Sequence, residues 1–144
     1  RMGKSATEAP FTKALSEIVG GGISVKDYTI PADDYTGTQV IELGVPPDMN
    51  ICLGIVWEID GEHLTGGESC EVFARIEETY GVTYYAWTER YVFEQTAGRQ
   101  TIKMPYHGSD NWWTDENWNV QVRLGLVMNG TFRIHSGTVR VYYV

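Results

Sequence analysis

The chain has 144 residues, of which 42% are hydrophobic, with five Trp and nine Tyr, so it can bury the core of one globular domain. Its 11 basic and 19 acidic residues leave a net charge of −8, which repels nucleic-acid phosphates and anionic lipid surfaces. No apolar run in the sequence approaches the roughly 20 residues that cross a bilayer, so we expect neither nucleic acid nor membrane insertion.

The first element that the sequence predicts is a short helix over residues 10–19. Pro10 suits the first helical position, and three glycines, Gly20–Gly22, end the run. The apolar positions recur near helical spacing: Phe11, Leu15, Ile18 and Val19. A helix this short needs its apolar stripe to dock on the domain body or on a partner chain. We expect residues 1–22 to be an N-terminal segment with a helix and a glycine joint, and residues 23–144 to be a separate β-domain.

After the glycine joint, apolar residues alternate with polar ones, and Gly, Pro and Asp punctuate the runs, which is typical of antiparallel strands. The predicted strands are 23–30, 38–45, 51–60, 70–79, 82–95, 100–104, 117–128 and 131–144. About eight strands without alternating helices predict an all-β fold, an antiparallel two-sheet sandwich of jelly-roll type with one short N-terminal helix.

The last predicted strand changes phase. Its apolar positions are even at Phe132 and Ile134 but odd at Val139 and Val141. One extra residue near Ser136-Gly137 must therefore form a bulge or a corner between sheets.

Turns and cysteines can also be predicted. Asp33-Asp34 after Pro31 indicates a turn, and Asn129-Gly130 indicates a tight hairpin turn rather than a glycosylation site. Cys52 lies out of phase with the apolar positions of its strand, whereas Cys70 lies in phase with those of the next. Opposite faces disfavour a disulfide, so we expect two free thiols.

The segment Tyr28–Asp48 runs strand, turn, strand and then the corner Leu43-Gly44-Val45-Pro46-Pro47-Asp48. Over residues 23–59 this order resembles β-sandwich domains of bacteriophage tail-fibre, baseplate and head-fibre appendages. The resemblance implies a non-enzymatic virion module that binds a host-surface glycan or a neighbouring virion protein. It also implies assembly in the host cytoplasm and a partnership with copies of itself as a homotrimer.

A predicted loop over residues 106–118 concentrates aromatic, acidic and amide side chains. Aromatic rings beside carboxylates and amides can bind a sugar, and they also occur at protein interface hot spots. The candidate ligand-binding residues are Tyr106, His107, Asp110, Asn111, Trp112, Trp113 and Asp115. A structural end-cap of the sandwich is the alternative. With Trp112, Trp113 and Tyr106 as a stacking platform, the chain could instead be a carbohydrate-binding module of a secreted glycoside hydrolase, or an extracellular adhesin domain of a bacterial surface.

No catalytic residue or cofactor is predicted. The sequence lacks a Gly-x-Ser-x-Gly elbow and zinc spacing among its three histidines, and the strand carboxylates Glu42, Glu58 and Glu89 fall in solvent-facing phases. Calcium stays open as an alternative, because two groups carry oxygen ligands. These groups are Asp110, Asn111, Asp115 and Glu116, and Asp33, Asp34 and Asp48.

Overall fold

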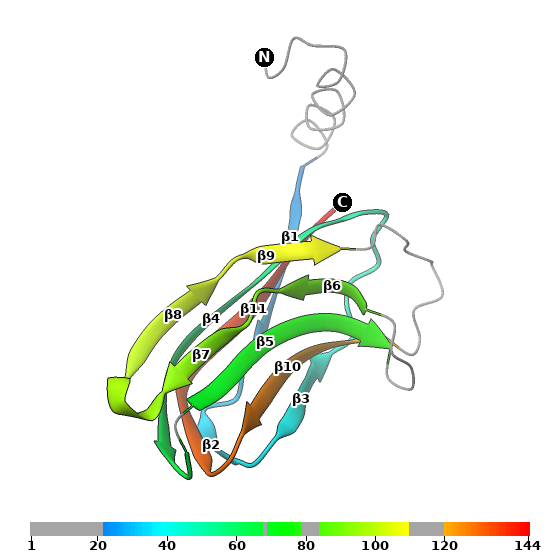
Figure 1. Ribbon diagram of the computed structural model, residues 1–144. Helices are drawn as coiled ribbons and strands as arrows, with labels where there is room; N and C mark the ends of the chain where they lie inside the picture. Colours follow the sequence, from blue (N-terminus) through cyan, green and yellow to red (C-terminus); the bar gives the residue numbers. More distant parts are fainter. Residues whose placement is uncertain (1–21, 68, 79–83, 110–119) are drawn as a thin grey trace.

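The computed structural model describes residues 22–67, 69–78, 84–109 and 120–144, which form two packed antiparallel sheets (Figure 1). Sheet A contains β1 (Ser24–Thr29), β2 (Asp33–Thr36), β4 (Cys52–Thr65), β8 (Gln100–Met104) and β11 (Thr131–Tyr143). Sheet B contains β3 (Gln39–Gly44), β5 (Ser69–Glu78), β6 (Tyr84–Thr88), β7 (Tyr91–Glu94), β9 (Tyr106–Ser109) and β10 (Val120–Met128). A 3-10 turn, Gln95–Ala97, precedes β8.

The eleven strand segments fill eight strand positions, because three strands are interrupted. β1 and β2 both pair with β11, and β6 and β7 both pair with β5. β8 pairs in sheet A and β9 in sheet B, so that strand changes sheets at Pro105. Counted by position, the first strand pairs with the eighth, the second with the seventh, the third with the sixth and the fourth with the fifth. A ribbon with these pairings rolls up into a jelly roll, which confirms the predicted fold class.

The space between the sheets is filled by one hydrophobic core with aromatic rings near its middle. The ring of Phe93, in sheet B, lies 4.9 Å from that of Phe132 and 6.3 Å from that of Trp57, both in sheet A, between ring centroids. β10 buries the alternating face that the sequence predicts: Val120, Val122, Leu124, Leu126 and Met128. Burial of such side chains stabilises the sandwich by about 1.5–3 kcal/mol each relative to exposure.

The predicted phase change in the last strand is a bulge. The register of β11 against β4 shifts between Ile134 and Ser136, so both halves of β11 face the core although their apolar positions differ in parity. The neighbouring strand breaks at the same level, where Pro31 separates β1 from β2. The Ile30 amide N–H there donates to the Gly137 carbonyl at 2.9 Å.

Three predicted boundaries are wrong. Asp33-Asp34, predicted as a turn, begins strand β2, because Asp34 lies opposite Arg133 and binds its guanidinium at 2.7 and 3.0 Å. The strand predicted over residues 82–95 is broken at Glu89-Arg90. Tyr106–Ser109, predicted as loop, is β9, which pairs with β6.

The Asn129-Gly130 turn joins two sheets rather than two paired strands, which corrects the predicted hairpin. A second connection between the sheets leads from β4 to β5 and begins after Thr65. Gly130 has a φ of 85°, and an added Cβ would collide with the Thr65 carbonyl group. The buried His63 ring reaches this turn, with Nε2 3.0 Å from the Asn129 carbonyl oxygen. Two adjacent crossings thus hold the sheets together at this end.

Both cysteines are free, as predicted, but the predicted reason, that they lie on opposite faces, is wrong. Cys52 is buried in the core, like Cys70, instead of lying on the opposite face. A register shift between Tyr142 and Tyr143, opposite Leu53, brings Cys52 inward. Burial raises the pKa of the Cys52 thiol to about 11 and that of Cys70 to about 12.

The predicted N-terminal helix lies outside the described residues, as do residues 20 and 21 of the predicted boundary. Within the described ranges, no helix is long and apolar enough to cross a membrane.

Replacing Phe132 by Ala should lower the free energy of unfolding by about 3–5 kcal/mol, because it removes a fully buried ring from the middle of the core. Urea denaturation followed by Trp fluorescence measures the loss. Val92→Ala, on the exposed outer face of β7, serves as the control and should change the free energy of unfolding by less than about 0.5 kcal/mol. Equal losses in both variants would contradict the assigned core.

Candidate functional site

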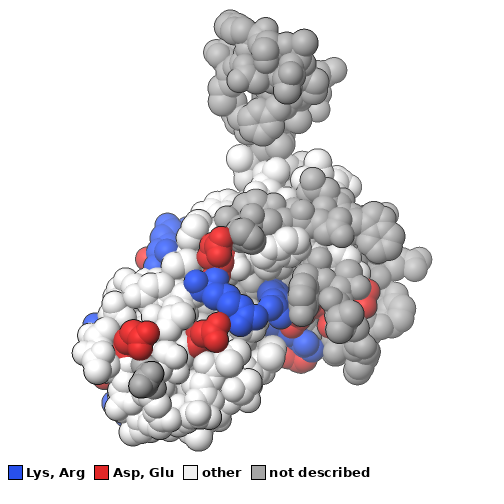
Figure 2. Space-filling view, viewed as in Figure 1, with Lys and Arg blue, Asp and Glu red and all other residues white. Residues whose placement is uncertain are grey.

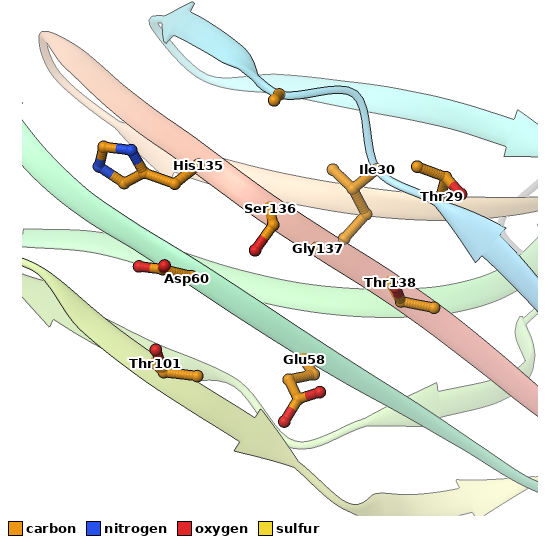
Figure 3. Close-up of a pocket in the computed structure, with 10 residues that line it drawn as sticks. Thr29, Ile30, Glu58, Asp60, Thr101, His135, Ser136, Gly137 and Thr138 are labelled. Atoms are coloured by element: carbon orange, nitrogen blue, oxygen red, sulfur yellow. The ribbon is translucent and has the colours of Figure 1, made fainter.

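An open groove of about 460 Å³ lies on the outer face of sheet A, beside the bulge in β11 (Figure 3). Its volume is within the range of small-ligand sites. The break between β1 and β2 forms one wall, with Ile30 and Ala32, and β8 forms the other. The groove therefore exists because two neighbouring strands, β11 and the β1–β2 strand, depart from regular pairing at the same level.

Two neighbouring rows of side chains make the floor of the groove. In the first row, Thr29, Thr138 and Glu58 face one another across β1, β11 and β4. In the second row, Ser136, Asp60 and Thr101 lie across β11, β4 and β8. Hydroxyl groups thus surround two carboxylates (Figure 3).

Two charged groups of the groove are already paired. The Asp60 carboxylate accepts two hydrogen bonds from the Arg99 guanidinium, at 2.9 and 2.8 Å. The Nε2 atom of His135 lies 2.7 Å from Oε2 of Glu62. These pairs fix the rim of the groove, and the salt bridge between Asp60 and Arg99 has no net charge.

The remaining polar groups have no partner. Within the described part of the chain, the exposed Glu58 carboxylate forms no hydrogen bond or ion pair, although Lys103 lies opposite it on β8. The hydroxyl groups of four neighbours are equally unengaged there: Thr29, Thr101, Ser136 and Thr138. The two oxygens of the Glu58 carboxylate can accept hydrogen bonds, and each of the four hydroxyl groups can both donate and accept. This combination suits a ligand rich in hydroxyl groups.

The pairing with Arg99 lowers the pKa of the Asp60 carboxyl, mainly through the two side-chain hydrogen bonds. A general acid of a glycosidase needs the opposite shift, since it must hold a proton near neutral pH. Asp60 is therefore not suited to act as the general acid of a glycosidase.

The outer face of sheet B carries a different surface. Phe73 points away from the core and covers Gly125, where an added Cβ would clash with the ring. The guanidinium carbons of Arg75 and Arg90 lie 4.2 and 4.4 Å from the ring centroid. Figure 2 shows the basic side chains gathered across this face beside acidic ones, and three exposed valines, Val40, Val92 and Val127, border it.

Of the predicted ligand-binding residues, Tyr106 and His107 are placed only by their backbone, on β9 at the edge of sheet B. The other five, Asp110, Asn111, Trp112, Trp113 and Asp115, lie outside the described residues. β9 belongs to the other sheet from the groove, so the groove is a separate site.

No group of three His, Cys, Asp or Glu residues in the described ranges is arranged to hold a metal ion. Of the acidic group proposed for calcium there, Asp34 is bound by Arg133, and Oδ1 of Asp33 accepts the Asp34 amide N–H. The group with Asp110 lies outside the described residues.

The sequence alone did not predict the groove residues as a site, although one feature of the sequence pointed to their position. The phase change near Ser136-Gly137 marks where β11 bulges, and the groove opens there. Thr29 and Thr101 carry no such signal, because only the pairing of β1 and β8 with the central strands brings them beside it.

No protein-family model and no curated protein matches the chain. Among solved structures, a chain of the infectious bursal disease virus Gx strain aligns over 84% of this chain and 32% of its own length, with 14% identity and a TM-score of 0.48. A chain of the cyanophage Pam1 capsid asymmetric unit aligns over 85% of this chain and 84% of its own length, with 17% identity and a TM-score of 0.45. The present chain thus spans about a third of the bursal disease virus chain.

The Asp60 carboxyl should titrate below the ordinary range of an aspartate, and Arg99→Gln should return its pKa toward that range. Because the folded-state pKa is the lower one, the pair stabilises the fold above about pH 4 and loses this contribution as the pH falls through the folded-state value. Carboxyl-carbon NMR measures the titration. Asp27, which Arg140 pairs with elsewhere on sheet A, is the internal control and should not respond.

Proposed function

We propose that the protein is a non-enzymatic structural module of a virus particle, a phage appendage domain, that binds a host-surface glycan in the groove beside the β11 bulge. Two observations support the virion assignment: the jelly-roll pairing of the strands and the resemblance of residues 23–59, with the corner Leu43–Asp48, to phage appendage domains. The observation that carries the binding function is the unpaired Glu58 among four free hydroxyl groups.

A glycan suits the groove better than an anion or an apolar ligand. The Glu58 carboxylate can accept hydrogen bonds from two sugar hydroxyl groups, and such charge-assisted bonds are about twice as strong as neutral ones. The same carboxylate repels anions, and hydroxyl-rich walls offer an apolar ligand little contact area. The groove residues include no Phe, Tyr or Trp ring on which a pyranose could stack, so we expect weak binding, on the order of millimolar.

Saturation-transfer NMR with the methyl glycosides of glucose, galactose, mannose and N-acetylglucosamine tests this function. At least one glycoside should receive saturation, and Glu58→Gln should weaken its binding by about tenfold, because a neutral acceptor replaces a charged one.

Glu94→Gln provides a matched control, since it removes the same charge from an exposed strand position on sheet B. It should bind like the parent protein. Transfer that is unchanged in Glu58→Gln, or absent with all four glycosides, would reject the groove as a glycan site.

We also propose that copies of the chain assemble with one another, as a homotrimer, through the outer face of sheet B. Val40 and Val127 are exposed there, beside Arg123, which binds Glu42 at 2.7 Å. Exposed valines between charges of both signs favour a second copy as the partner, because symmetry can place each positive group against a negative one.

Light scattering coupled to size exclusion should give about three times the 16.2 kDa chain mass. Val40→Glu combined with Val127→Glu should reduce the mass to that of one chain, because it buries two charges in the contact. Thr96→Glu, in the exposed 3-10 turn, is the control and should leave the mass unchanged. A parent protein that is monomeric at every concentration would contradict self-assembly, but it would not contradict the proposed glycan site.

A further inference from the structure

Exposed apolar side chains gather on the outer face of sheet A at the end where β1 begins. Ile23, Val25 and Ile51 are 44%, 49% and 44% exposed. Val25 lies opposite the half-buried Tyr142 in the pairing of β1 with β11. We call these four residues, Ile23, Val25, Ile51 and Tyr142, the apolar end patch.

The members of the patch lie on, or directly before, the three adjacent strands β1, β11 and β4. Ile51, just before β4, exchanges two backbone hydrogen bonds with Val144, at 3.3 and 3.1 Å, directly after the end of β11. Alternation turns the members outward, since their neighbours Cys52 and Val141 are buried.

Charged and hydroxyl groups lie next to the patch on this face. The bidentate pair of Arg140 with Asp27, at 2.6 and 3.0 Å, borders it, and the groove with Glu58 lies beyond. Single exposed valines and isoleucines are ordinary on a protein surface, whereas a contiguous group marks a contact.

The chain itself contains a segment that fits this patch. Residues 1–21, outside the described residues, enter the domain at Gly22 and Ile23, and Ile23 belongs to the patch. The sequence predicts that residues 10–19 form an amphipathic helix, about 15 Å long, whose apolar stripe needs a surface to cover. The three glycines of the joint span at most about 10 Å. This length lets the chain reverse its direction and return to the patch, but it does not let residues 10–19 reach a distant part of the domain.

We propose that residues 10–19 pack their apolar stripe on the apolar end patch of the same chain. The short tether favours the same chain, because it holds the segment near the patch at a millimolar or higher effective concentration, against micromolar second copies. This inference stands apart from the glycan groove and from the assembly face on sheet B.

The reactivity of a thiol placed in the patch tests the proposal. In Val25→Cys, maleimide labelling at pH 7 should be at least tenfold slower than in the same variant with Leu15→Asp and Ile18→Asp, which cannot dock. The native Cys52 and Cys70 do not interfere, because both are buried. Lys26→Cys is the matched control: it is the next residue of the same exposed strand, but it faces the other way, so its labelling should be equal in both backgrounds.

Disulfide trapping then identifies which copy supplies the segment. Oxidation of the double variant Leu15→Cys and Val25→Cys at micromolar protein should give a cross-linked product that migrates at the mass of one chain. A product at the mass of two chains would show exchange of the segment between copies and would overturn the proposal. Equal labelling of Val25→Cys in the two backgrounds would overturn it as well.

Discussion

Strand β11 has to bury Phe132 and Ile134 near its start and Val139 and Val141 near its end, and these pairs differ in parity along the chain. A regular strand would turn one of the pairs to solvent, at a cost of about 1.5–3 kcal/mol for each side chain. The bulge at Ile134–Ser136 resolves this conflict. The strand beside it is interrupted at the same level, between Thr29 at the end of β1 and Asp33 at the start of β2, and the groove opens there.

Charge pairing decides which groups on the surface of sheet A remain free. Three arginines there each bind one aspartate with two hydrogen bonds: Arg99 with Asp60, Arg133 with Asp34 and Arg140 with Asp27. Exposed pairs of this kind add little stability, but they order the side chains and neutralise them. In a chain with more acidic than basic residues, this pairing leaves some carboxylates without a cation, and Glu58 in the groove is one of them.

Prediction from the sequence succeeded where side chains alternate and failed where pairing overrides local preference. The buried face of β10 and the bulge in β11 follow directly from the parity of apolar residues. Asp33-Asp34 has turn chemistry, yet cross-strand pairing with Arg133 holds it in β2.

The sequence by itself determined that two amphipathic sheets form, where most of the strands run and that β11 bulges, because parity and turn residues are local properties of the chain. Only the tertiary structure decided which strands are neighbours. That choice places Thr29, Glu58 and Thr101, from three separate strands, beside the bulge, and leaves Ile23 and Ile51 exposed at the end of sheet A where β1 begins. Sites of this kind are made by contacts between residues far apart in sequence, and no local pattern encodes such contacts.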